Sequence, residues 1–174
     1  MKLLVINPSA DLYGANRILV NTLEFLQEQY EITLLLPGKG PLEQFIEERK
    51  LNVRVIVNTT MPTIGRMMFN AKGLVNLFKE ASKTYGYLRR LKKQYGIDCV
   101  YINTQAGLPV LKLCKLIGIP ALLPVHEIVD RPRIAARLIN KASLRWADKI
   151  VAVSEPVKNN MLQNGNMPRH EKKV

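Results

Sequence analysis

Residues 3–36 read LLVINPSADLYGANRILVNTLEFLQEQYEITLLL, and this stretch decides the fold. It opens and closes with continuous apolar runs, at residues 3–6 and 32–36, which are typical of strands covered on both faces. Between these runs, helical spacing places on one stripe Ala15, Leu19, Leu23 and Leu26. The stretch therefore predicts a strand, a helix and a second strand, the repeating unit of a parallel sheet.

The same alternation continues along the chain. Four further apolar runs, which we predict to be strands, lie at residues 53–57, 99–102, 121–125 and 150–153. Further helices are expected at residues 41–50, 107–117 and 156–163. Pro41 would open the first of these, and Gly118 would cap the end of the second. This pattern predicts an α/β fold: a single doubly wound Rossmann-like domain with a mostly parallel central sheet.

One region departs from this alternation. Residues 59–66 read as a loop, and a basic helical region continues from there to Gln94. Gly73 and Gly86 interrupt that region, so one bent helix and two helices are both compatible with the sequence. We expect the domain to span residues 1–165, and residues 166–174 to form a tail or the start of an interdomain linker.

The composition is that of a globular domain with a basic surface. The chain has 174 residues, of which 47% are hydrophobic, enough for one well-filled core. Lys and Arg number 26 against 14 Asp and Glu. The resulting net charge of +12 favours an anionic partner: a phosphate, a nucleic acid or an acidic membrane surface. Cys99 and Cys114 cannot build a disulfide framework, and we interpret them as small buried thiols in a reducing compartment.

No segment of the sequence predicts insertion into a membrane. The apolar run after Met1 is too short for a secretory signal, and no apolar run approaches the roughly 20 residues of a spanning helix. We therefore expect a cytoplasmic protein, either in solution or peripheral on the inner face of the membrane.

Polar loops follow several of the predicted strands. In an open parallel sheet, ligands bind beyond the carboxyl ends of the strands, which selects the loops at residues 7–16, 103–107, 126–131 and 154–156. In the first loop, Gly14 and Ala15 would let a phosphate or a sugar approach the free N–H groups of a helix start. The same residues can also form only a turn and a helix cap.

His126 directly follows the predicted strand at residues 121–125. At the mouth of a cleft, an imidazole can donate a hydrogen bond to a developing anion or move a proton near neutral pH. The alternative is a histidine that only caps the next helix. The sequence has no metal-ligand spacing, no Gly-x-Ser-x-Gly turn and no Gly-x-Gly-x-x-Gly loop, so we expect neither a metal ion nor an organic cofactor.

Basic residues are concentrated in two segments. In residues 66–93 they are interleaved with large apolar side chains. In residues 133–149 a helix would carry a basic stripe of Arg133, Arg137, Lys141, Arg145 and Lys149. An apolar face would lie beside this stripe, formed by Ile134, Leu138, Ala142 and Trp146. The residues that we predict to face a membrane are Arg66, Lys72, Arg89, Arg90, Arg133 and Arg137.

Three interpretations of these basic segments can be compared. Cations beside exposed apolar side chains suit an anionic bilayer surface. The same pattern also fits helix faces that are only solvated. Nucleic acid is disfavoured as a partner, because neither an aromatic platform nor a recognition helix is apparent.

Four segments, in order, resemble the N-terminal half of the retaining glycosyltransferases of family 4, which have the GT-B fold. The segment 13–17, YGANR, resembles the Gly-Gly-Ala-Glu-Arg motif of that family. VYINT at 100–104 precedes a helix, and PALLPVHE at 120–127 resembles the strand that ends in His-Asp or His-Glu. The fourth segment, ADKIVAVSE at 147–155, is the most specific. The resemblance extends over residues 1 to about 165.

This resemblance implies the acceptor-binding domain of a hexosyltransferase. Such an enzyme transfers a sugar from a nucleotide-sugar donor to a glycan or a lipid-linked acceptor, as in the synthesis of polysaccharides or glycolipids. His126 would be the catalytic residue, in contact with the donor sugar or stabilising the transferring centre. The other residues that the resemblance places in the cleft are Tyr13, Gly14, Ala15, Asn16, Asn103, Thr104, Glu127, Ser154 and Glu155.

The sequence departs from the family pattern at two positions and lacks one large part. Tyr13 replaces a glycine and would narrow the cleft, and Asn16 replaces a glutamate and removes a negative charge. The C-terminal domain of the family, which holds the nucleotide and two glutamates eight residues apart, has no counterpart in these 174 residues. We therefore expect the chain alone to be inactive, and the donor-binding domain to be supplied in the same protein or by a partner.

Two other functions remain open at this point. The first is a non-catalytic Rossmann-like binding or assembly module that an anionic membrane or a partner protein recruits. The second, which we rank lower, is a nucleotide-sugar epimerase of similar architecture.

Overall fold

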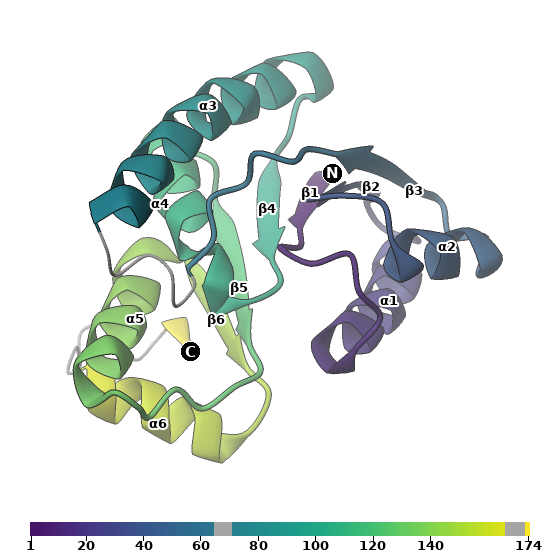
Figure 1. Cartoon of the computed structure of the whole chain (residues 1–174). Coiled ribbons are helices and arrows are strands. Elements are labelled where there is room, and N and C mark those ends of the chain that lie inside the picture. Colours follow the sequence, from purple (N-terminus) through teal and green to yellow (C-terminus); the bar gives the residue numbers. More distant parts are fainter. Residues whose placement is uncertain (65–70, 166–172) are drawn as a thin grey trace.

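A computed structural model of the chain describes residues 1–64, 71–165 and 173–174. Within these residues, six strands form one parallel sheet in the order β3-β2-β1-β4-β5-β6 (Figure 1). The strands are β1 (Lys2–Ile6), β2 (Glu31–Leu36), β3 (Val53–Val57), β4 (Cys99–Ile102), β5 (Ala121–Val125) and β6 (Lys149–Ala152). The predicted doubly wound, Rossmann-like fold is confirmed, and its sheet is parallel throughout the described residues.

Helices cover both faces of this sheet. They are α1 (Gly14–Leu26), α2 (Pro41–Glu48), α3 (Ala71–Tyr95), the 3₁₀ turn η2 (Gln105–Gly107), α4 (Leu108–Ile117), α5 (Arg133–Trp146) and α6 (Glu155–Gly165). α1 and α2 lie on one face, and α3 to α6 lie on the other (Figure 1). Alternate residues of β1 serve the two layers: Leu3 and Val5 pack with α1 and α2, and Leu4 packs in the cluster of the other layer.

β1 occupies the centre of the sheet, where the order of the strands reverses. Val5 lies opposite Leu34 of β2 on one side and opposite Tyr101 of β4 on the other. The chain therefore leaves β1 toward one edge of the sheet and returns beside it as β4. In doubly wound sheets, the crevice at such a switch point, at the carboxyl ends of the strands, is where ligands bind.

The predicted elements match the structure closely. The strands at residues 53–57, 99–102 and 121–125 have the predicted bounds, and Gly118 caps α4 with a left-handed φ of 70°. Within the described residues 71–95, the basic region is a single helix, α3, which runs uninterrupted through Gly86. Glycine lowers helix stability but does not end a helix that packs against a core, here through Leu88 and Leu91.

The basic stripe predicted for residues 133–149 needs one correction. Lys149 is not part of a helical stripe, because α5 ends at Trp146 and Lys149 begins β6. The first two residues of the predicted apolar face are exposed to solvent: Ile134 is 75% exposed and Leu138 is 64% exposed. The buried residues of α5 are instead Ala136, Asn140, Ser143 and Leu144. Small and amide side chains at these positions let α5 pack closely against α6, where a Cβ on Gly165 would collide with Leu144.

Charge is distributed unequally between the two helical layers. α3, α4 and α5 carry seven, two and four Lys or Arg residues, and Glu80 is the single acidic residue in these three helices. In the other layer, α1 and α2 contain the four glutamates Glu24, Glu43, Glu47 and Glu48 and one cation, Arg17. The positive charge of the chain is therefore concentrated on one face of the sheet.

Three further expectations can be compared with the described residues. Cys114 is free and buried, and this burial raises the pKa of its thiol to about 12; Cys99 is free and partly buried. Of the predicted tail, residues 166–172 lie outside the described part, and Lys173 Nζ donates a hydrogen bond to the carbonyl oxygen of Ala147 at 2.8 Å. None of the helices in the described ranges has the length and apolar character needed to cross a bilayer.

Candidate functional site

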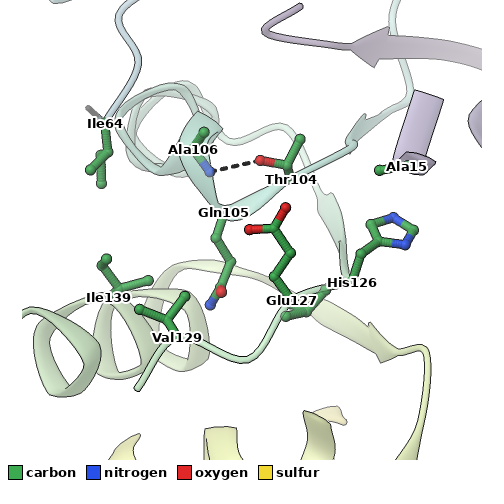
Figure 2. A pocket seen from close by; sticks show the side chains of 10 residues that line it. Ala15, Ile64, Thr104, Gln105, Ala106, His126, Glu127, Val129 and Ile139 are labelled. Carbon is green, nitrogen blue, oxygen red and sulfur yellow. Dashed lines mark hydrogen bonds between the residues drawn. The ribbon is translucent and has the colours of Figure 1, made fainter. Parts of the chain in front are cut away.

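A cavity of about 270 Å³ lies at the carboxyl ends of β4 and β5, beside the start of α1 (Figure 2). Its lining comes from loops that the chain places far apart: the first turn of α1, the turn η2, the loop after β5 and one face of α5. The lining residues are Ala15, Ile64, Thr104, Gln105, Ala106, Val125, His126, Glu127, Val129 and Ile139. The cavity therefore occupies the position at which a doubly wound sheet binds its ligands.

The start of α1 is an uncapped helix N-terminus beside this cavity. The N-cap residue Tyr13 makes no side-chain capping hydrogen bond, and the first turn contains no acidic residue. Gly14 has a φ of +31°, a backbone conformation that residues with a Cβ rarely adopt. The free N–H groups and the positive end of the helix dipole are thus available to an anion.

His126 lies between this helix start and the rest of the cavity. Both of its ring nitrogens are buried, and neither has a hydrogen-bond partner in the described structure. Burial lowers the pKa of the imidazole, and the nearby Glu127 carboxylate opposes this shift to a smaller extent. At neutral pH the ring is therefore neutral, with one nitrogen able to donate a hydrogen bond and the other able to accept one.

The neighbouring side chains point in different directions from the same loop. His126 points toward Ala15 at the start of α1, and Glu127 points toward Thr104 (Figure 2). Thr104 is fixed because its hydroxyl oxygen accepts a hydrogen bond from the backbone N–H of Ala106 at 2.9 Å. One side of the cavity thus presents an imidazole and a helix start, and the centre presents a carboxylate and a hydroxyl.

A buried cluster of three amides holds the start of α1 against the sheet. Asn103 Nδ2 donates to Asn7 Oδ1 at 3.0 Å and to Asn16 Oδ1 at 3.3 Å. Asn16 Nδ2 in turn donates to the carbonyl oxygen of Asp11 at 2.8 Å. Asn7 follows β1, Asn103 follows β4 and Asn16 belongs to α1, so the cluster joins the two central strands to the helix. We call these three residues the amide cluster.

The opposite wall is held by a second set of polar contacts. Gln105 Nε2 donates to Asn140 Oδ1 at 3.1 Å and to Ser143 Oγ at 2.9 Å. These bonds attach the turn η2 to the buried face of α5. The walls of the cavity are therefore positioned by buried, paired groups rather than by surface loops alone.

The residues predicted from the sequence fall into three groups. Ala15, Thr104, His126 and Glu127 line the cavity. Asn16 and Asn103 are buried in the amide cluster, where they position α1 and do not line the cavity. Tyr13 is 79% exposed, Gly14 starts α1, and Ser154 and Glu155 are exposed at the start of α6 outside the cavity lining. The functional roles of all these residues stay predictions.

Several lining residues carry no functional signal of their own in the sequence. Two loops, those that follow β4 and β5, contain Gln105, Ala106 and Val129. These loops were predicted from their position after a strand and not from the individual residues. Ile64 and Ile139 come from a loop and a helix far from any strand end, and no local pattern indicates that they reach the cavity.

The predicted membrane-facing residues lie away from the cavity. Arg89 and Arg90 are exposed on α3, and Arg133 and Arg137 are exposed on α5. Arg66 and the side chain of Lys72 lie outside the described residues. In the part of the chain that the structure describes, no group of three or more His, Cys, Asp or Glu residues is arranged to hold a metal ion.

The family of the chain follows from its sequence. The profile of Glycosyltransferase Family 4 matches residues 13–174, which include both the start of α1 and the loop of His126. The chain belongs to glycosyltransferase family 4. No curated protein matches it in sequence.

Solved structures of low sequence identity share the fold. Anabaena Alr3699/HepE, in complex with UDP and glucose, is 19% identical, with a TM-score of 0.68 over 95% of this chain and 41% of that one. A glycosyltransferase from Rickettsia africae is 19% identical, with a TM-score of 0.69 over 99% of this chain and 41% of that one. UDP-GlcNAc 2-epimerase from Neisseria meningitidis, bound to UDP-GlcNAc, is 14% identical, with a TM-score of 0.68 over 100% and 45%. The fold is therefore that of a GT-B Rossmann-like domain, and the chain spans about two fifths of the length of these proteins.

The amide cluster should make a measurable contribution to stability. We predict that Asn103→Ala lowers the free energy of unfolding by about 2–4 kcal/mol, because it leaves buried oxygens of Asn7 and Asn16 without their donor. Asn21→Ala, an exposed change on the same helix, is the control and should stay within about 0.5 kcal/mol. Urea unfolding measures both, and equal effects of the two changes would show that the cluster does not hold α1.

The environment of His126 should be visible in its titration. We predict a pKa below the ordinary value of 6.5, and a further decrease in Glu127→Gln, because the carboxylate raises the pKa. The unfolded chain then binds the proton more tightly than the folded one, so stability should decrease as the pH falls from about 6.5 through the folded pKa. NMR titration of the imidazole in a His170→Gln background gives a single histidine signal. A pKa at or above 6.5 would contradict the prediction.

Proposed function

We propose that this chain is the acceptor-side domain of a retaining hexosyltransferase that uses a nucleotide-sugar donor. The acceptor is a glycan or a lipid-linked sugar, as in polysaccharide or glycolipid synthesis. The observation that carries the proposal is the cavity at the switch point of the sheet, where an uncapped helix start faces an imidazole with two free nitrogens. Family membership supports the class of reaction, and the geometry supports the choice of residues.

In this proposal the start of α1 interacts with the phosphates of the donor. The N–H groups near Gly14 and Ala15 and the positive helix end stabilise negative charge, and no side chain of the first turn competes for them. This charge increases on the leaving phosphate as the bond to the sugar breaks. Groups already aimed at that charge lower the barrier without reorganising. The structures of HepE with UDP and with UDP-glucose support a nucleotide sugar as the donor.

His126 is proposed to bind the transferring sugar. A neutral imidazole whose nitrogens are unpaired can donate to one sugar oxygen and accept from another hydroxyl. The ring is held beside Ala15, so these bonds would orient the sugar next to the phosphates at the helix start. Glu127 and Thr104 lie on the other side and would contact the acceptor.

The donor nucleotide itself requires a second domain. In our proposal that domain belongs to the same protein or to a partner, and the chain alone has negligible turnover because nothing fixes the base and ribose. The proposal assigns no metal ion or organic cofactor to this chain, and it treats the nucleotide sugar as a substrate. We propose a cytoplasmic location, where a peripheral position on the membrane is compatible with the basic layer.

This function can be tested on the chain and on the complete enzyme. Titration with UDP-glucose should shift the NMR signals of Gly14, Ala15 and the His126 ring, with affinity on the order of millimolar, and glucose alone should not. When a donor-binding domain is present, His126→Ala should lower kcat by about 100-fold, and the exposed control Asn21→Ala should leave it unchanged. Normal turnover by the chain alone, or an unchanged rate in His126→Ala, would contradict the proposal.

A second candidate function is supported by the distribution of charge. The layer of α3, α4 and α5 carries 13 Lys or Arg residues and the single acidic residue Glu80. A non-catalytic module that docks on an anionic surface would need such a layer and would not need the cavity. The two functions are also compatible, because a membrane-docked enzyme would present its cavity beside the bilayer.

Flotation with lipid vesicles tests this docking. We predict binding to vesicles that contain anionic lipid and not to neutral ones, because each cation near the surface contributes about 1 kcal/mol. The double change Arg89→Glu and Arg90→Glu should weaken binding by at least about tenfold. The matched control, Lys39→Glu and Lys50→Glu, makes the same change in net charge beside α2 and should have a much smaller effect. Equal and negligible binding to both vesicle types would refute the docking.

A further inference from the structure

A second cavity, of about 360 Å³, runs along the exposed side of α5. Its walls are apolar and consist of Ile64, Leu108, Leu138, Ile139, Ala142 and Trp146. The remaining lining residues are Lys141 and Arg145, which lie one helical turn apart on α5. We call this cavity the α5 groove.

The α5 groove borders the cavity of the proposed function, and two residues belong to the lining of both. Ile64 and Ile139 line both of them. In Figure 2 these two residues lie at the end of the site opposite His126 and Ala15. The two cavities are therefore neighbours, so that one elongated molecule with a polar part near Glu127 and Thr104 could have its apolar part in the groove.

The groove gives a role to an apolar row of α5 that is not fully buried: Leu138 is exposed, and Ala142 and Trp146 are half-buried at the margin of the core. Leu138, Ala142 and Trp146 follow one another at intervals of four residues, and the buried face of the helix lies elsewhere. Leu138 is 64% exposed, although burying such a side chain would stabilise a complex by about 25 cal/mol per Å² of apolar area. A sugar alone would gain little from these walls, whereas a hydrocarbon chain would bury them.

The charge at the groove restricts the class of ligand further. Lys141 and Arg145 belong to α5. Neither α5 nor the neighbouring α4 contains an acidic residue that would neutralise their positive charge. Lys112 of α4 adds a third cation, with its Nζ 5.3 Å from the centre of the Trp146 ring. An apolar chain that carries an anionic group matches both the walls and the edge of the groove.

We propose that the α5 groove binds the hydrocarbon chain of an acceptor that is linked to lipid through a phosphate. The sugar part of this acceptor enters the cavity of His126, and the phosphate lies near Lys141 and Arg145. This inference rests on the proposed function, since it selects the lipid-linked class from the two acceptor classes considered there. It also predicts that the groove binds its ligand in solution, when no bilayer is present.

The groove contains its own spectroscopic probe. Trp146 is the single tryptophan of the chain, so its fluorescence reports on the groove alone. We expect farnesyl phosphate, added in solution without vesicles, to give a saturable change in this fluorescence. Inorganic phosphate should give none, and farnesol should bind at least about fivefold more weakly than farnesyl phosphate.

Matched variants show whether the apolar wall and the cations carry this binding. Leu138→Gln should weaken farnesyl phosphate binding at least about fivefold. Leu116→Gln, an equally exposed change on α4 outside the groove, should not alter it. The double change Lys141→Gln and Arg145→Gln should remove the preference for farnesyl phosphate over farnesol. Because these side chains are exposed, each variant should keep the circular dichroism spectrum of the parent.

Three results would overturn the inference. The first is no saturable change with farnesyl phosphate, and the second is equal weakening by Leu138→Gln and Leu116→Gln. The third is self-association in sedimentation experiments that Leu138→Gln abolishes, which would assign the groove to a second copy of the chain. If farnesyl phosphate fails but UDP-glucose still shifts the His126 signals, the lipid-linked acceptor is wrong and the proposed transferase stands. The reverse result would contradict the transferase.

Discussion

The amide cluster of Asn7, Asn16 and Asn103 is the interaction on which the site depends. It lies where the strand order reverses, and it joins the ends of β1 and β4 to the first turn of α1. The backbone N–H of Asn103 also donates to the carbonyl oxygen of Ile6 at 3.0 Å, so β1 and β4 stay paired up to their carboxyl ends. Asn103 Nδ2 donates to both other members of this buried cluster, so few other arrangements keep the oxygens of Asn7 and Asn16 paired, and an unpaired polar group is costly there. The Oδ1 of Asn103 itself has no partner in the described structure.

The site uses the rigidity that this cluster provides. An uncapped helix start binds an anion well only if its N–H groups are held in place. The amide cluster holds them beside His126. The pairing of Gln105 with Asn140 and Ser143 does the same for the opposite wall. His126 is then the one cavity residue with two buried and unpaired nitrogens in the described structure, next to a helix end that stabilises negative charge. This arrangement suits a transfer reaction in which charge develops on a leaving phosphate.

α5 belongs both to the basic layer and to the wall of the site, because its three faces have different roles. One face, with Ala136, Asn140, Ser143 and Leu144, packs into the domain. The apolar row through Leu138 and Trp146 borders the α5 groove, and the row of Arg and Lys residues beside it faces solvent. A helix built in this way brings cations, an apolar wall and one side of the cavity into contact. The proposed site and the proposed binding groove for an anionic amphiphile therefore share this one helix.

The sequence by itself determined the order and the bounds of most strands, because continuous apolar runs reflect strands that are covered on both faces. It also determined which loops surround the site, since all carboxyl ends of a parallel sheet lie at one edge. The tertiary structure decided which face of α5 is buried. Small and amide side chains lie on that face because α6 packs closely against it and because it contains the hydrogen-bond partners of Gln105. The periodicity of the apolar residues indicates neither of these contacts. The tertiary structure likewise decided that Asn16 and Asn103 position α1 rather than line the cavity, and that Ile64 and Ile139 reach it. Such contacts join residues far apart in the chain, and only packing brings them together.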